Sequence, residues 1–291
     1  YGGAGWELTF TDQKRLGDWE YALGVNLMNQ HLSHITLAGA RKYDYPPTFT
    51  YHEPWWNDYK YINDHYARLS MALSSGRQIN RILVIEPTTT AWLYDSYVKR
   101  NPRLAEIGQS FQSFVTKLEK SQVECDLGSE NIMKDLGSVA GSQMVVGQCS
   151  YSTVVIPPLT ENIELETFRL IERYINKGGK LVAFSIPTIL NGSDSPDLKN
   201  FFEKNKGKII IEERLISEII EKYFTNEDVV FTRQEGGALY HHRRVLSDGQ
   251  ILFLANSSLK DSLTGSLDIS GTGVIELNTL TGEIAGFPGM K

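Results

Sequence analysis

The chain has 291 residues, of which 41% are hydrophobic and 22% charged, and its formal net charge is −6. This length favours two or three domains, each with its own core, and the composition is that of a globular protein. The negative charge and the lack of basic runs argue against a nucleic-acid partner. No apolar run approaches the roughly 20 residues that span a bilayer.

The start of the chain and its cysteines set two further expectations. Tyr1 is neither an initiator Met nor part of a signal segment, so we expect the chain to be a piece of a longer protein. Cys125 and Cys149 fall on separate predicted elements and support neither a disulfide framework nor a zinc site. We expect no cofactor, and no residue is assigned to a metal.

A helix is predicted within residues 1–23, with Thr11 as its N-terminal cap. The apolar residues at helical spacing in it are Leu16, Trp19 and Leu23. A short apolar strand is predicted at 24–29, followed by a polar and aromatic loop. Residues just past the carboxyl end of a strand face the ligand site in repeating strand–helix folds, so we expect the chemistry in segment 24–56.

A second helix is predicted from about Pro54 to Ser75, because Pro suits a first helical turn and Gly76 suits the stop. The apolar residues of this helix, spaced alternately by four and three, are Trp55, Tyr59, Ile62, Tyr66, Leu69 and Leu73.

Residues 77–210 are predicted to form an α/β unit. Its apolar strands are expected at 79–85, 153–156 and 180–185, and its helices at 102–119 and 162–176. Strands without polar alternation, separated by helices, indicate a mostly parallel sheet covered on both faces. The segment lacks a Gly-rich phosphate loop and a G-x-S-x-G motif, so we expect it to be non-catalytic.

Residues 211–291 are predicted to form a small antiparallel β-sandwich after a helix at 215–223. The expected strands are 228–232, 238–246, 250–256, 262–269 and 273–277. Alternation along 238–246 places His241 and Arg243 on one face, which is predicted to be solvated.

Aromatic residues are concentrated near the start of the chain, where the first 66 residues hold 14 of the 31 and four of the five Trp. A sugar presents a C–H face to an aromatic ring and hydroxyls to polar groups, so this segment suits carbohydrate. Core packing is the favoured alternative for Trp19, Tyr59 and Tyr66, which have helical spacing. For Trp6 and Trp55 both interpretations stay open.

Two carboxylates are candidates for acetal cleavage, which needs one acid for the leaving oxygen and one base or nucleophile on the other face. Glu7 in GGAGWE and Glu53 in YHEPWW have aromatic neighbours that could raise a carboxyl pKa by desolvation. The alternative for Glu7 is an ordinary surface carboxylate. For Glu53 it is a helix N-terminal residue favoured by the macrodipole.

His31 and His34 follow the predicted strand, and metal ligation would need a third partner that the spacing does not supply. We expect them to be structural or to form hydrogen bonds with sugar hydroxyls. Asn26 could point from the strand toward the same site.

Three segments carry a family resemblance. GWELTFTDQKRLGDWEYALGVNLMNQHLSHITLAGARKYDYPPTFTYHEPWWNDYKYINDHYARLS resembles the last part of the (β/α)8 catalytic barrel of bacterial glycoside hydrolases, near the α-L-rhamnosidase-like family 106 and family 2-like sugar-binding relatives. RILVIEPTTTAWLY is similar to the glutamine-amidotransferase-like domain that follows such barrels, also in family 42 β-galactosidases. LYHHRRVLSDGQILFLANSS resembles the start of the next β-domain. The resemblance spans essentially all of the chain.

This resemblance implies a barrel remnant at 1–76, an amidotransferase-like domain at 77–210 and a β-domain at 211–291. It also implies catalytic carboxylates at strand ends, with Glu7 as the first choice. The residues expected to line or border the sugar pocket are Trp6, Asn26, His31, His34, Glu53 and Trp55. Two of eight strand–helix units cannot close a barrel, so we expect the chain alone to be inactive.

The sequence therefore predicts part of a secreted or periplasmic glycoside hydrolase with a carbohydrate substrate. Its expected partner is the N-terminal part of the same protein or a second copy of the chain. The alternative is a non-catalytic module for carbohydrate binding or assembly. A third interpretation, an active amidotransferase, needs a Cys nucleophile with a His, and neither cysteine has that setting.

Overall fold

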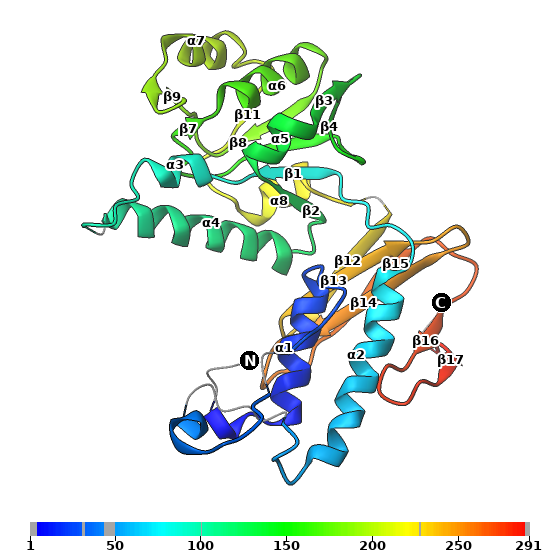
Figure 1. The fold of residues 1–291 in the computed structure, drawn as a ribbon. Coiled ribbons are helices and arrows are strands. Elements are labelled where there is room, and N and C mark those ends of the chain that lie inside the picture. Colours follow the sequence, from blue (N-terminus) through cyan, green and yellow to red (C-terminus); the bar gives the residue numbers. More distant parts are fainter. Residues whose placement is uncertain (1–4, 31–32, 44–49, 100, 227, 289–291) are drawn as a thin grey trace. The chain divides into compact units, whose positions relative to one another are not determined.

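The computed structural model describes residues 5–30, 33–43, 50–99, 101–226 and 228–288 (Figure 1). The chain divides into two compact units. We call Ile79–Glu227 the central unit, and the unit assembled from Tyr1–Gln78 and Asp228–Lys291 the terminal unit. The three-part division expected from the sequence stays a prediction. No helix in the described part of the chain is long and apolar enough to cross a membrane.

The central unit is built on a five-stranded sheet in the order β11-β8-β6-β1-β2, in which every pair of neighbours is parallel. The strands are β1 (Ile82–Ile85), β2 (Cys125–Gly128), β6 (Thr153–Ile156), β8 (Lys180–Ala183) and β11 (Ile210–Ile211). Every residue of β1 and β6 is buried, as expected for strands covered on both faces. The predicted mostly parallel sheet is confirmed.

Helices cover this sheet and form two apolar clusters with it. The helices are α3 (Thr88–Trp92), α4 (Pro102–Lys120), α5 (Glu130–Leu136), α6 (Leu165–Asn176), α7 (Pro196–Lys204) and α8 (Ser217–Tyr223). Leu83 and Ile85 belong to the cluster that includes α6, whereas Ile82 and Val84 belong to the cluster that includes α4. Successive strand residues point to opposite faces, so β1 contributes to both clusters.

Several short strands of the central unit lie outside the parallel sheet. One antiparallel sheet contains β3 (Gly137–Ala140), β4 (Gln143–Val146) and β5 (Cys149–Tyr151), and another small sheet contains β7 (Asn162–Ile163), β9 (Ile189–Leu190) and β10 (Ser193–Asp194). The helix predicted at 162–176 begins at Leu165, because 162 and 163 pair with β9 instead.

The terminal unit places two helices against antiparallel strands. The helices are α1 (Phe10–Ala22) and α2 (Tyr59–Ser74), and short 3-10 turns occur at η1 (Gly5–Glu7), η2 (Gly39–Tyr43) and η3 (Trp56–Asp58). The antiparallel pairs are β12 (Val229–Glu235) with β15 (Thr264–Ile269), β13 (Leu239–Val245) with β14 (Gln250–Asn256), and β16 (Ile275–Leu277) with β17 (Ile284–Gly286). The core between α1 and α2 is aromatic, and its Tyr21 and Tyr66 rings stack 5.8 Å apart.

Helix α1 differs from its prediction in its cap and its buried side. Thr9, not Thr11, caps the helix, and it forms a capping box with Asp12. The predicted apolar residues Leu16, Trp19 and Leu23 are not fully buried. The buried residues are Gln13, Gly17, Tyr21 and Ala22, because α2 packs on that side. A Cβ on Gly17 would lie 2.2 Å from the Tyr66 hydroxyl, so glycine allows this close contact.

The strand predicted at 24–29 is wrong, because residues 25–30 form neither helix nor strand. A strand needs a neighbouring backbone to satisfy its N–H and C=O groups, and no described strand pairs with this segment. The predicted second helix begins at Tyr59 rather than Pro54, after η3. Its five expected core residues from Tyr59 to Leu73 are buried, whereas Trp55 lies outside the helix.

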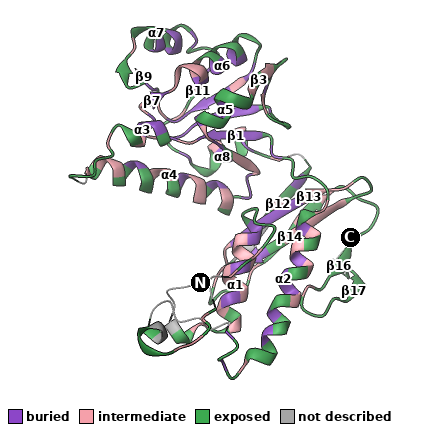
Figure 2. Cartoon of the chain, in the orientation of Figure 1, coloured by how far each residue is buried: buried purple, intermediate pink, exposed green. Residues whose placement is uncertain are grey.

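The solvated face predicted on β13 is also wrong. His241, His242 and Arg243 are all buried, as are the first two residues of β13. Figure 2 colours the buried parts of the chain purple. Helix α1 packs against this strand, where the Nδ1 atom of His242 lies 2.8 Å from the Tyr21 carbonyl oxygen. The ring of Phe231 lies 4.9 Å from that of His241. Both faces of the strand are therefore covered.

Candidate functional site

The candidate site is the segment 50–58, which leads into α2. Consecutive turns shape it, because the Thr50 carbonyl accepts from the Glu53 N–H at 3.0 Å and the Glu53 carbonyl accepts from the Trp56 N–H at 3.1 Å. In these turns Thr50 and Glu53 are buried, whereas Tyr51 and Trp56 are exposed. A polar residue thus lies inside a turn whose aromatic residues face solvent.

Glu53 is the most unusual residue of this segment. Its side chain is only 8% exposed, and its Oε1 atom is enclosed without a hydrogen-bond partner among the described residues. Loss of water raises the pKa of this carboxyl, and the charge of His52 opposes the rise only in part. A raised pKa favours the protonated form of a carboxyl, and that form can donate a proton to a leaving group.

A short polar chain supports the turn that carries Glu53. The Ser33 hydroxyl donates to the Thr50 hydroxyl at 3.0 Å, and the Thr50 hydroxyl contacts the Nδ1 atom of His52 at 3.2 Å. The Tyr51 hydroxyl donates to the Ile35 carbonyl. These contacts join segments 33–35 and 50–52. The sequence does not mark Thr50 or His52 as residues that support this turn. Their contacts form because Thr50 is buried next to Ser33, which is 17 residues away in the chain.

The other predicted site residues lie in several places. Glu7 ends η1 and is exposed, and the neighbouring Trp6 is 38% exposed. Asn26 is exposed, and its carbonyl accepts a long hydrogen bond of 3.5 Å from Ser74 on α2. His31 lies outside the described residues. His34 and Trp55 are half-buried, and Trp55 shares the turn of Glu53.

An aromatic stack continues from this turn into α2. The rings of Trp56 and Tyr59 are nearly parallel, at 6° and 6.0 Å, and Phe10 lies 5.9 Å from Tyr59 on another side. Burial raises the pKa of Tyr59 to about 12. The packing interpretation is confirmed for Tyr59 and Tyr66, which belong to the core.

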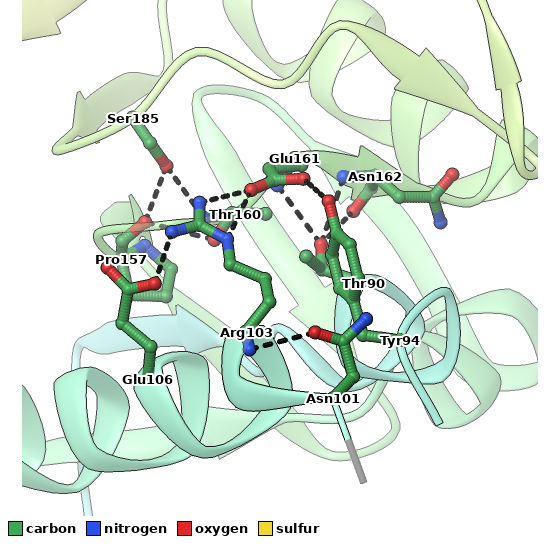
Figure 3. A network of polar contacts seen from close by, with 10 residues as sticks. All are labelled: Thr90, Tyr94, Asn101, Arg103, Glu106, Pro157, Thr160, Glu161, Asn162 and Ser185. Atoms are coloured by element: carbon green, nitrogen blue, oxygen red, sulfur yellow. Dashed lines mark hydrogen bonds and ion pairs between the residues drawn. The ribbon is translucent and has the colours of Figure 1, made fainter. Parts of the chain in front are cut away.

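The carboxyl edge of the parallel sheet in the central unit holds a polar network (Figure 3). Glu161 accepts hydrogen bonds from the Tyr94 hydroxyl and from the Arg103 guanidinium, and the Thr90 hydroxyl accepts from the Glu161 N–H at 3.0 Å. Across the edge, Ser185 donates to the Pro157 carbonyl at 2.7 Å. These groups form hydrogen bonds with one another at the carboxyl edge of the sheet, which is the edge where open α/β sheets bind ligands.

Cys125 lacks the setting of a nucleophile. Burial raises the pKa of the Cys125 thiol well above its ordinary value. Cys149 is exposed on β5. Within the described ranges, no group of three or more His, Cys, Asp or Glu residues could hold a metal ion.

Comparison with known proteins identifies a likeness at the level of fold. No protein-family model and no curated protein matches the chain. A rhamnosidase from Novosphingobium sp. PP1Y aligns with 97% of this chain at 17% identity and a TM-score of 0.63. The chain therefore has a fold similar to that of the aligned part of this rhamnosidase. It spans only 27% of the rhamnosidase chain. The apo exo-carrageenase GH42 from Bacteroides ovatus aligns with 77% of this chain and 29% of its own, at 14% identity and a TM-score of 0.46.

Proposed function

We propose that the chain is part of a glycoside hydrolase that cleaves glycosidic bonds of complex carbohydrate in the manner of an α-L-rhamnosidase. The observation that carries the proposal is Glu53, a buried carboxyl with an enclosed oxygen and a raised pKa in an aromatic turn. Glycoside hydrolysis needs a carboxylic acid of this kind to protonate the leaving oxygen. The similarity of the fold to part of a rhamnosidase and the family resemblance of the sequence support the same function.

In this proposal Glu7 is the catalytic carboxylate, and Glu53 borders the sugar pocket as a proton donor. The other residues proposed around the sugar are Trp6, Asn26, His31, His34 and Trp55. The exposed position of Glu7 leaves it accessible to a large substrate.

The proposed architecture places the end of a (β/α)8 barrel at 1–76, an amidotransferase-like domain at 77–210 and a β-sandwich at 211–291. The parallel sheet of the central unit supports the second of these domains, and the antiparallel pairs of the terminal unit support the third. The described part of 1–76 contributes the helices α1 and α2 and no named strand. The enzyme is proposed to be secreted or periplasmic. The chain alone is proposed to be inactive until the rest of the barrel, from the same protein or a second copy, completes the site.

One observation favours a second candidate function, a non-catalytic carbohydrate-binding or assembly module. Several aromatic residues of the terminal unit are exposed, including Tyr43 at 80%, Tyr51 at 53% and Trp56 at 44%. Exposed aromatic faces bind sugars or partner proteins without chemistry. This function predicts saturable sugar binding that is lost in Trp55→Ala, with no hydrolysis in any context.

Hydrolysis of aryl α-L-rhamnosides by the full-length protein tests the proposed function. Glu7→Gln is expected to lower kcat by about 10³-fold or more, since it removes a catalytic carboxylate. Glu53→Gln is expected to slow a poor leaving group, such as an alkyl alcohol, far more than dinitrophenol, which leaves without protonation. Glu276→Gln, an exposed carboxylate on β16, is the matched control and should keep wild-type kcat.

The outcome of this test separates the two functions. Normal turnover in Glu7→Gln would remove Glu7 from the site. An equal effect of Glu53→Gln on both leaving groups would show that Glu53 does not act as the proton donor. No hydrolysis by the full-length protein of any aryl glycoside would leave the binding module as the function.

A further inference from the structure

A pocket lies beside the segment 50–58, where η3 meets α2. It has a volume of about 310 Å³ and is lined by Trp56, Asn57, Tyr59, Lys60 and Asn63. This volume is at the lower end of the range of about 300–1,000 Å³ for small-molecule sites, and the pocket is shallow and open to solvent, so it offers room for about one sugar ring. Trp56 and Asn57 belong to the segment 50–58, and Trp56 is one of the exposed aromatic residues that favour the second candidate function, but none of the five is among the residues proposed for hydrolysis.

The aromatic wall of this pocket is held in place before any ligand binds. Trp56 is 44% exposed, and its ring lies parallel to that of Tyr59, which is only 7% exposed. Tyr59 is in turn packed against Phe10. A buried ring therefore supports an exposed one, and the indole offers a flat face at little cost in side-chain freedom.

The polar residues of the pocket supply hydrogen-bonding groups next to that face. Lys60 and Asn63 are three residues apart on α2 and so lie on the same side of the helix. Asn57 and Asn63 are exposed, and neither side-chain amide forms a hydrogen bond with another described residue. Each amide offers donors and an acceptor to a ligand.

The charge of the pocket is balanced. The Lys60 ammonium donates to the Asp64 carboxylate one turn along the helix, and this hydrogen bond lowers the pKa of Asp64. A phosphate would therefore compete with a carboxylate for its cation. A purely apolar partner would cover the Asn57 and Asn63 amides without pairing them, which is unfavourable.

We infer that Trp56, Asn57, Lys60 and Asn63 form a binding site for a neutral pyranose ring, separate from the groups proposed for hydrolysis. One C–H face of the sugar would lie on the Trp56 indole, and its hydroxyls would pair with the two amides and the ammonium. This site binds sugar whether or not the protein hydrolyses it. It would hold a neighbouring sugar unit of a polysaccharide.

The test is an NMR titration of the 291-residue chain with methyl α-L-rhamnopyranoside and, in parallel, methyl β-D-glucopyranoside. The Trp56 indole N–H signal is identified by its absence in Trp56→Ala. At least one pyranoside is expected to shift this signal saturably. Trp56→Ala, followed through the backbone amide of Asn63, should weaken binding by about tenfold or more, a loss that corresponds to one aromatic contact.

Two further variants keep the test decisive. Asn63→Leu should weaken binding several-fold without touching the indole. Trp92→Ala removes another exposed Trp, 57% exposed on α3 in the central unit, and should leave the dissociation constant unchanged. If Trp56→Ala does not fold, Trp56→Phe, which keeps a ring, should still bind while Asn63→Leu binds weakly.

Three results would overturn the inference. The first is that neither pyranoside shifts the Trp56 signal saturably. The second is that Trp92→Ala weakens sugar binding as much as Trp56→Ala does. The third is that millimolar inorganic phosphate displaces the sugar. The proposed hydrolysis fails separately, because a protein that binds pyranosides at Trp56 but cleaves no aryl glycoside retains this site.

Discussion

Glu119 on α4 is expected to make the stability of the central unit depend on pH. Burial raises the pKa of this carboxyl from its ordinary value of 4.5 to about 7. The folded chain therefore holds the proton more tightly than the unfolded chain does. The resulting stabilisation is complete below about pH 4.5 and is lost as the pH rises through about 7. The difference between the two pKa values corresponds to at most about 3 kcal/mol.

The variant Glu119→Gln isolates this effect, because glutamine has nearly the same shape and carries no charge at any pH. At pH 5 the variant and the wild type should have similar free energies of unfolding. At pH 8 the variant should be more stable, by up to about 3 kcal/mol, since only the wild type must then bury a carboxylate or protonate it.

Urea denaturation at pH 5, 6, 7 and 8 measures the difference. Labelling of Cys125 by a thiol reagent during denaturation reports on the central unit, because this residue lies on β2, inside that unit. Glu172→Gln, an exposed carboxylate on α6, is the matched control and should follow the wild type at every pH. Parallel pH profiles of Glu119→Gln and the wild type would refute the burial argument.

Two other predictions concern the central unit. In the native chain Cys149, which is exposed, should react rapidly with a thiol reagent, and Cys125, which is half-buried and whose thiol pKa is raised by burial, should react much more slowly; equal rates for the two thiols would contradict this difference. At the sheet edge, Glu161→Gln should lower the free energy of unfolding by about 1–2 kcal/mol, because it loses charged hydrogen bonds from Arg103. Glu106→Gln, which removes the more exposed partner of Arg103, should cost less than about 0.5 kcal/mol, and equal costs would contradict this distinction.

The parallel sheet could be predicted from the sequence only where its strands are apolar. Strand β6 was predicted with its observed bounds because TVVI is buried on both faces. Strand β2 was missed, since CDLG contains a charged residue and a glycine. It becomes a strand through its pairing with β1, and the Asn80 side chain reinforces this by donating to the Cys125 carbonyl at 3.0 Å and to Asp126 at 2.7 Å.

The same limit applies to buried polar residues, among them the proposed site residue Glu53. Glu53 could be selected from its aromatic neighbours in the sequence, but its burial depends on a turn closed by the Thr50 carbonyl, which no residue pattern marks. His65 is comparable. The spacing of α2 predicts its apolar core and does not explain a buried histidine, which is stabilised there because its Nε2 atom lies 2.7 Å from Asp18 on α1. Spacing identifies the residues that face a core, whereas a buried polar group depends on a partner from a distant segment. For the hydrolysis proposed above, burial therefore favours Glu53 over the exposed Glu7 as the proposed proton donor.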